Sequence, residues 1–325
     1  MTDADLWRPT THLEALRQRA AQLAYLREFF AKRSVLEVET PVLARHGVTD
    51  LHLDSISARL SPIPGCSQDR GWLQTSPEYH MKRLLADGAG AIYQVFRAFR
   101  DGERGGRHNP EFSLLEWYRP EFSDVDLMAE VADLVCGWLG CAQPRVHSYR
   151  EAMHQFTGVD PFEVPDAELY RRCERWVGHS GATELERDGC LELLMSHEVE
   201  VALREQPPTF IVDYPASQAA LARVSCKDGH PVAHRFELYV SGIELCNGYW
   251  ELTDVDEQRR RFEADNAARK AAGKPVMPID EALLAALASG LPDCAGVALG
   301  LDRLLMLKLG AASIDEVVSF PLERA

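Results

Sequence analysis

Three short segments, far apart in the chain, carry side chains that could together bind a nucleotide. They are residues 99–102 with 108–112, the pair at 237 and 244, and residues 296–303. Arg100 and Arg303 could hold phosphates, because a planar guanidinium group donates paired hydrogen bonds to phosphate oxygens. Glu237 and Glu244 could share a divalent ion, and Phe112 could stack on a base. The set predicts a site for a nucleoside triphosphate with Mg²⁺.

Arg100 stands at the end of a predicted strand over residues 92–99, and a second predicted strand runs over residues 112–118. The charged hairpin loop between them has about 12 residues, which is longer than a structural turn needs and usually indicates function. Taken alone, Arg100 is typical of a surface loop, and Phe112 is typical of a core.

Glu237 and Glu244 flank a predicted strand turn, so that their carboxylates lie on adjoining strands. Two nearby carboxylates repel each other unless a cation joins them, and Mg²⁺ bound to nucleotide phosphates would be such a cation. The alternative is a pair of exposed strand residues. Against it, Glu244 lies in the apolar stretch 242–246, where an unpaired charge is costly.

Residues 296–303 have two glycines, Gly296 and Gly300, and read as a strand that leads into a helix. The glycine spacing is weak evidence, because close packing often produces it. Arg303 is more informative, since a cation in the first turn of a helix is unfavourable beside the positive end of the helix dipole unless an anion is near. A terminal phosphate would be that anion.

The elements around these segments predict an α+β fold, in which helices flank an antiparallel sheet. Helices are expected at ~12–33, from Ser76 (N-cap) and Pro77 onward, at 125–139 with Asp124 as cap, at 254–272 and at 280–289. Strands are expected at 35–39, 71–74, 92–99, 112–118, 209–212, 235–240, 242–246 and 296–299. Strands and helices do not alternate regularly, which disfavours a doubly wound parallel sheet. We expect one domain over residues 1–325, with a mostly helical insertion at about 144–206.

Composition excludes several classes of protein. Hydrophobic residues make up 46% and charged residues 26% of the 325 residues, as in ordinary globular proteins. No apolar run could cross a bilayer, and residues 1–5 do not resemble a signal peptide, so that a cytoplasmic protein with no membrane partner is expected. The net charge of −15 argues weakly against nucleic acid as the main partner.

The remaining candidates for metal or anion sites have simpler interpretations. Eight cysteines occur without a C-x-x-C pair, which argues against zinc and favours small apolar fillers. The basic group formed by residues 259–261, Arg269 and Lys270 is expected to be a solvated helix face.

The three segments, together with Pro41, resemble the signature motifs of class II aminoacyl-tRNA synthetases. The helix, strand and Pro41 resemble motif 1, which forms the dimer interface in that family; residues 99–112 resemble motif 2, and residues 296–303 resemble motif 3. Residues 75–85, 108–112 and 244–252 are similar to the lysyl branch. The resemblance covers nearly the whole chain and implies a homodimer that activates a carboxylate with ATP.

The resemblance also implies roles for individual residues. The ATP-binding residues would be Arg100, Asp101, Gly102, Asn109, Phe112, Glu244, Leu245, Gly300 and Arg303, with Arg100 and Arg303 catalytic. The amino-acid-binding residues would be Ser76, Pro77, Glu78, Tyr118, Asn247, Glu251 and Ala298, and the metal ligands Glu237 and Glu244. A doubly cationic amino acid needs two separated carboxylates, which fits Glu251 for the ε-ammonium group and Glu78 for the other amino group.

Three departures from the lysyl synthetases narrow the resemblance. About a dozen residues precede the motif 1 helix, too few for the anticodon-binding OB-fold barrel. Ala298 replaces a glycine, and its methyl group would disfavour ordinary α-lysine. Gly102 takes the usual glutamate position of motif 2. A stand-alone core with this alanine resembles the elongation factor P–(R)-β-lysine ligase family, which implies β-lysine and elongation factor P as substrates.

Three alternatives remain open. A truncated lysyl-tRNA synthetase would share all the activation chemistry and charge tRNA, although tRNA is not the expected partner. An asparagine-synthetase-like amide ligase fits less well, because Glu251 and Tyr118 suit a basic side chain. A catalytically inactive binding module is disfavoured by the presence of Arg100, Glu244 and Arg303.

Overall fold

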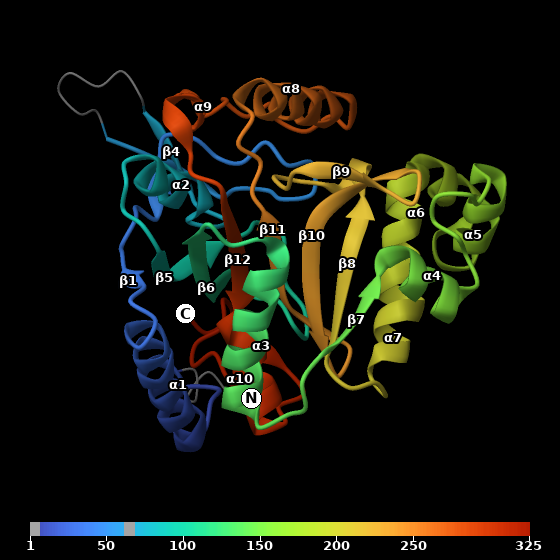
Figure 1. Cartoon of the computed structure of the whole chain (residues 1–325). Helices are drawn as coiled ribbons and strands as arrows, with labels where there is room; N and C mark the ends of the chain where they lie inside the picture. The colour runs from blue at the N-terminus through green and yellow to red at the C-terminus, as the bar shows by residue number, and fades with distance from the viewer. Residues whose placement is uncertain (1–6, 62–68) are drawn as a thin grey trace. The chain divides into compact units, whose positions relative to one another are not determined.

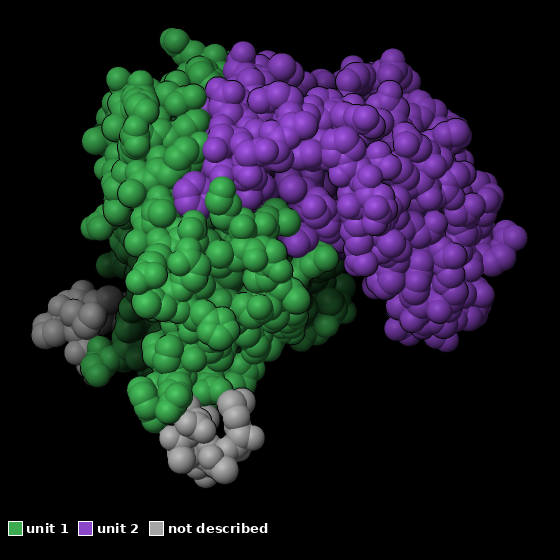
Figure 2. Space-filling model, turned by 90° about the horizontal axis from the view of Figure 1, so that it is seen from below, with its two compact units in different colours: residues 1–122, 252–325 green, residues 123–251 purple. Residues whose placement is uncertain are grey.

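The computed structural model describes residues 7–61 and 69–325, which form two compact units (Figures 1 and 2). Unit 1 comprises Met1–Phe122 and Leu252–Ala325, and unit 2 comprises Ser123–Glu251. Two features of the sequence, the segment 1–5 and Cys66, lie outside the described residues. In the part of the chain that is described, no helix is both long enough and apolar enough to span a membrane.

Unit 1 is built on four strands of the larger sheet. They are β1 (Leu36–Glu37), β5 (Ile92–Phe99), β6 (Glu111–Pro120) and β12 (Cys294–Gly300). β5, β6 and β12 pair antiparallel, and β1 joins β5 in parallel. A smaller sheet contains β2 (Leu43–Ala44), β4 (Arg70–Leu73) and β3 (Ser57–Arg59), in that order.

The helices of unit 1 come from both ends of the chain. They are α1 (Leu13–Ala31), α2 (Glu78–Ala86), α8 (Val255–Ala271), α9 (Glu281–Gly290), α10 (Leu301–Leu309) and the 3₁₀ turn η4 (Ile314–Glu316). α1 buries Leu26 and Phe30 because they recur on one face at helical spacing. The Phe30 ring stacks on Tyr93, with ring centres 4.2 Å apart, and meets Trp117 edge-on at 5.5 Å. This aromatic cluster fixes α1 on the sheet.

The two faces of strand β6 carry different kinds of side chain. Successive side chains of a strand point to opposite faces, so Trp117 faces α1 while Phe112, Glu116 and Tyr118 share the other face. In the antiparallel register, Glu116 lies opposite Gln94 of β5 and Ala298 of β12. Polar residues therefore gather on the β6 face turned away from α1.

Unit 2 contains five strands and most of the remaining helices. The strands are β7 (Arg145–Ser148), β8 (Thr209–Pro215), β9 (Val224–Lys227), β10 (His230–Val240) and β11 (Ile243–Trp250). The helices are α3 (Asp124–Leu139), α4 (Tyr149–Thr157), α5 (Asp166–Glu184), α6 (Glu186–Leu194) and α7 (Glu200–Leu203), with the π-helical turn η2 (Met195–Val199) and the 3₁₀ turn η3 (Ala216–Gln218). β7 pairs with β8 in parallel, and β8, β9, β10 and β11 pair antiparallel.

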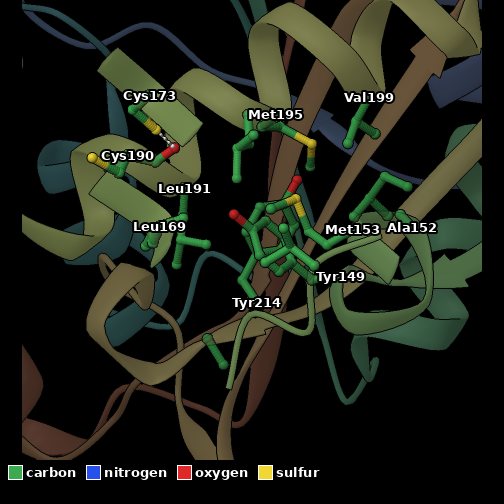
Figure 3. Close-up of a cluster of buried hydrophobic side chains, with 14 of the residues drawn as sticks. Tyr149, Ala152, Met153, Leu169, Cys173, Cys190, Leu191, Met195, Val199 and Tyr214 are labelled. Atoms are coloured by element: carbon green, nitrogen blue, oxygen red, sulfur yellow. Dashed lines mark hydrogen bonds between the residues drawn. The ribbon is translucent and has the colours of Figure 1, made fainter. Parts of the chain in front are cut away.

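A buried cluster holds helices α4 to α7 to the strands of unit 2 (Figure 3). Tyr149 of α4 meets Tyr214 of β8 with ring centres 4.9 Å apart, and Met195 lies among the same side chains. Cys173 and Cys190 are fully buried in this cluster, where the Cys173 thiol donates to the Cys190 carbonyl oxygen at 3.4 Å. Burial raises the pKa of the Cys173 thiol to about 12, so that it behaves as an inert apolar filler.

The predicted α+β class is confirmed, and most predicted elements lie within a few residues of the observed ones. The sheet is mixed rather than purely antiparallel, because β1 and β7 each pair in parallel. Ser123, not Asp124, caps α3, since its hydroxyl accepts the Asp126 amide hydrogen in a capping box. Residues 144–206 are mostly helical, although they also contain β7. The single catalytic domain over 1–325 stays a prediction.

Two interpretations of side chains need correction. Among the described cysteines, Cys226 is exposed and Cys141 is half-buried, so neither is the buried filler that was expected. Arg269 is not on a solvated face: it is 2% exposed, and its guanidinium group donates to the carbonyl oxygens of Asp50 and Pro275 and to the Asp54 carboxylate. The helical period did not reveal this, because two of the three partners, Asp50 and Asp54, come from a distant loop.

Replacing Arg269 with alanine should lower the free energy of unfolding by about 3 kcal/mol, because several buried acceptors would lose a charged donor. Urea or thermal denaturation measures the loss. Lys270→Ala is the matched control, since Lys270 is the exposed neighbour on the same helix and should change stability by less than about 0.5 kcal/mol. Equal effects of the two variants would contradict the assignment.

Candidate nucleotide-binding and substrate-binding site

Arg100 lies in unit 1 at the point where β5 passes into the long hairpin loop. Its backbone amide donates to the Pro110 carbonyl oxygen at 2.9 Å and closes the base of the loop. The guanidinium group lies over the Phe112 ring, 5.0 Å from its centre, and its Nη1 is 3.6 Å from Glu103 Oε1. Arg100 Nε is buried and has no hydrogen-bond partner among residues 7–61 and 69–325. The side chain therefore keeps a donor for an anion.

Arg303 lies in the first turn of α10, and its Nη2 is 2.8 Å from Nε2 of His108. Burial is the main cause that lowers the pKa of His108. The positive charges of neighbouring arginines lower the pKa further, and Glu103 opposes them; these arginines are Arg303, Arg100 and Arg107. The neutral imidazole can accept a hydrogen bond from Arg303. The structure thus places Arg303 against an imidazole of the loop that begins at Arg100, from a segment about 200 residues away in the sequence.

The position of α10 depends on a residue that the sequence analysis did not single out. Asp302 is 3% exposed, forms an ion pair with Arg19 of α1, and accepts the backbone amide hydrogen of Ser113 at 2.7 Å. Gln22 of α1 donates to the Leu301 carbonyl oxygen at 3.2 Å. Gly300 lies opposite Leu114 in the β6–β12 register. These contacts hold Arg303 beside the hairpin loop.

Gly102 has a backbone reason to be glycine. Its φ is +75°, a left-handed conformation that other residues rarely adopt. The Asp101 amide donates to the Asp54 carbonyl oxygen at 2.8 Å, so this turn is also attached to the loop that contains Asp54. Glycine in place of the usual motif 2 glutamate therefore permits the turn that follows Arg100.

Glu116 is a buried carboxylate that the sequence analysis missed. It is 2% exposed and accepts hydrogen bonds of 2.7 Å from the hydroxyls of Ser76 and Tyr118, two residues predicted to bind the amino acid. Ala298 lies opposite Glu116 on β12. The missed signal was a charge inside the apolar run 112–118, the same argument that we applied to Glu244. An anionic group in this position can bind an ammonium group.

Other predicted residues of unit 1 are already engaged. The Glu78 carboxylate forms a 2.7 Å ion pair with the buried Lys82, and the Glu78 amide donates to Ser76 Oγ at 3.0 Å, just after Pro77. α2 accordingly begins at Glu78. Asn109 donates to the Glu111 carbonyl oxygen at 2.7 Å and accepts the Leu322 amide hydrogen at 3.2 Å. Ligand contacts by Glu78 and Asn109 stay predictions.

The predicted metal ligands lie in unit 2, on one face of β10 and β11. Glu237 lies opposite Asn247, and Glu244 lies opposite Tyr239 after a bulge. The Glu237 carboxylate accepts 2.6 Å bonds from the Tyr214 and Tyr239 hydroxyls and forms a 2.5 Å ion pair with Arg235.

This arrangement balances the charge of Glu237 without an ion. Residues 7–61 and 69–325 contain no group of three or more His, Cys, Asp or Glu side chains placed to hold a metal. A divalent ion at the two glutamates would therefore need oxygens from a ligand such as a triphosphate.

Three more predicted residues lie on β11 or directly after it. Leu245 is buried, and Asn247 Oδ1 is buried without a hydrogen-bond partner in the part of the chain that the structure describes. Glu251 is 1% exposed, and its carbonyl oxygen accepts a 3.1 Å bond from Arg223. A buried carboxylate and a buried amide oxygen, four residues apart, are suitable acceptors for an ammonium group.

ATP should raise the pKa of His108, because phosphates beside Arg100 and Arg303 add negative charge. NMR titration, with the signal assigned by His108→Gln, measures the change. In the ligand-free protein the folded pKa lies below the unfolded one. The contribution of His108 to stability is therefore present above the unfolded pKa. It is lost as the pH falls from the unfolded pKa to the folded pKa. A pKa that does not move with ATP would contradict the phosphate assignment.

Comparison with known proteins places the chain in a family. The model of the family "tRNA synthetases class II (D, K and N)" matches residues 4–324. Curated relatives from Salmonella paratyphi B, Salmonella schwarzengrund and Salmonella paratyphi C are each 48% identical over 327 residues, which cover 100% of this chain and 100% of each relative. All three are named elongation factor P–(R)-β-lysine ligase. The chain therefore belongs to the class II aminoacyl-tRNA synthetase family of the D, K and N group.

Proposed function

We propose that this protein is an ATP-dependent ligase that joins (R)-β-lysine to a lysine ε-amino group of translation elongation factor P. The observation that carries the proposal is the contact of Arg303 with His108, on the hairpin that also carries Arg100 and, in its strand β6, the buried Glu116. One cationic group for a phosphate, Arg100, and an anionic group for an amine thus belong to one hairpin, and α10 places the second cationic group, Arg303, against its loop. The names of the relatives, which are 48% identical to this chain over its full length, support the same substrates.

The reaction has two steps. The β-lysine carboxylate attacks the α-phosphorus of ATP, pyrophosphate leaves, and a β-lysyl-adenylate forms. The acceptor amine then attacks the acyl carbon, AMP leaves, and the amine gives up a proton as the amide forms. The substrate supplies the nucleophile in each step, so catalysis depends on alignment and on stabilising phosphate charge.

Arg100 and Arg303 supply that stabilisation in the proposal. Arg100 is the candidate for the α-phosphate, because its Nε has no hydrogen-bond partner among the described residues and its guanidinium group lies over Phe112, the candidate for stacking on the base. Arg303 is the candidate for the terminal phosphate. When bound, Mg²⁺ would neutralise phosphate charge, and Glu237 and Glu244 are the candidate ligands; Arg235 pairs with Glu237 in the ligand-free protein.

Glu116 is the candidate ligand for the amino group near the carboxylate of β-lysine, and Glu251 and Tyr118 are the candidates for the ε-ammonium group. The methyl group of Ala298, opposite Glu116, narrows the space beside the reacting end of the amino acid. This crowding supports a preference for the β isomer, whose amino group is one carbon further from the carboxylate.

A cytoplasmic homodimer is part of the proposal, since elongation factor P acts in translation. Leu13 and Leu16 of α1 and Leu36 of β1 are 61%, 44% and 58% exposed. Exposed apolar side chains of this size on the motif 1 elements suit a protein interface.

Purified protein with ATP, (R)-β-lysine and elongation factor P should increase the mass of the acceptor by one lysyl residue, measured on the intact protein. Arg303→Ala should lower the rate of pyrophosphate exchange by at least about a hundredfold, because a group that stabilises phosphate charge is removed. Arg97→Ala, at an arginine 58% exposed on β5, is the matched control and should keep its activity. Labelled tRNA as the main product, or full exchange by Arg303→Ala, would contradict the proposal.

Glu116→Gln should raise the KM for β-lysine by about tenfold or more, with little change in the KM for ATP, because the substitution removes a charged acceptor worth about 1.5–3 kcal/mol. Pyrophosphate exchange at varied concentrations of each substrate separates the two constants. Glu111→Gln, at the exposed start of the same strand, should change neither. An unchanged KM for β-lysine would remove Glu116 from the amino-acid site.

A further inference from the structure

The hairpin loop that carries His108 is attached to the segment 313–323 through an ion-pair network. Arg104 of the loop donates from Nε to Glu323 Oε1 at 2.6 Å and from Nη2 to Glu323 Oε2 at 2.8 Å. The same Nη2 is 3.0 Å from Asp315 Oδ2. The two carboxylates raise the pKa of Arg104, chiefly through the hydrogen bonds to Glu323. A fork-to-fork pair of this kind fixes orientation as well as distance.

Backbone groups of the same two segments add further attachments. The Ile314 amide donates to the Gly106 carbonyl oxygen at 2.8 Å, at the tip of the loop. The Leu322 amide donates to Asn109 Oδ1 at 3.2 Å, at the end of the loop. The segment 313–323 therefore contacts the loop at its tip, at its end and at Arg104, which restrains the loop along its length.

Arg104 also connects this attachment to the turn that holds His108. Its Nη1 is 3.4 Å from the carbonyl oxygens of both Gly105 and His108, which themselves form a β-bridge. His108 in turn is the partner of Arg303. A continuous series of polar contacts runs from Glu323 through Arg104 to the residues that we assign to phosphate binding.

We propose that Arg104 is a positioning residue and that the segment 313–323, acting through it, holds the nucleotide loop in its ATP-binding conformation. The inference rests on the proposed function. Arg104 is unlike Arg100, because its donors are directed to two carboxylates and to the loop's own carbonyl oxygens, so it fixes the loop rather than contacting ATP. Without these contacts, ordering the loop when ATP binds would cost conformational entropy and weaken ATP binding.

Glu323→Gln gives the sharpest test, because two explanations predict opposite signs. If Glu323 acts only through its charge, its removal lowers the repulsion of ATP and lowers the KM for ATP. If it positions the loop, its removal raises the KM for ATP by about three- to fivefold, the range expected for a partly exposed ion pair. We expect the rise, with kcat at saturating ATP nearly unchanged.

Arg104→Gln should raise the KM for ATP to a similar degree, and the double variant should be little worse than either single variant, because both remove one interaction. Hydrogen exchange of the amides in residues 104–109 should become faster in each variant. Glu281→Gln is the matched control: it breaks another two-bonded pair in unit 1, with Arg259, and should change neither the KM nor the exchange in the loop.

A lower or unchanged KM for ATP in Glu323→Gln, additive effects of the two substitutions, or unchanged exchange in the loop would each overturn the positioning role. None of these outcomes affects the proposed function, which is tested by whether the wild-type protein forms the adenylate and modifies its acceptor. Absence of adenylate formation by the wild-type protein would overturn the proposed function instead.

Discussion

The site of unit 1 depends on holding two positive charges near one another before any ligand arrives. Arg303 contacts His108, the charge of Arg100 helps to lower the pKa of the same imidazole, and burial, the main cause, keeps it neutral so that it accepts a hydrogen bond instead of adding a third charge. The repulsion between guanidinium groups is tolerated because rigid elements fix each one. Arg303 is held through Asp302, and Arg100 through the base of the hairpin. Such preorganised charge is what a triphosphate requires.

Much of this arrangement was accessible from the sequence, because local patterns determine it. The apolar period of α1, the β5–β6 hairpin and the β12–α10 junction follow from patterns that extend over fewer than about twenty residues. The pairing of distant segments was accessible only through the resemblance to class II synthetases, since no local pattern states that residue 303 lies next to residue 108.

The remaining features depend on contacts between distant residues that no periodicity records. Arg269 was assigned to a solvated face because its helix is charged throughout, yet three loop acceptors bury it. Glu116 was overlooked because the sequence alone does not show which side chains bind a carboxylate within an apolar strand. The presence of glycine at position 102 is explained only by its positive φ angle. Arg269 and Glu116 each have a partner far away in the sequence, and Gly102 is explained by its backbone conformation.

The alternation of side chains along β6 has a consequence for which sequence changes the hairpin can accept. Phe112, Glu116 and Tyr118 must point to one face of the sheet, while Trp117 must point to the other face to contact Phe30. Deleting a single residue between Phe112 and Glu116 would turn these two side chains toward opposite sides of the sheet. The loop before Phe112 is free of this restriction. A natural change in length is therefore not expected within the strand between Phe112 and Glu116.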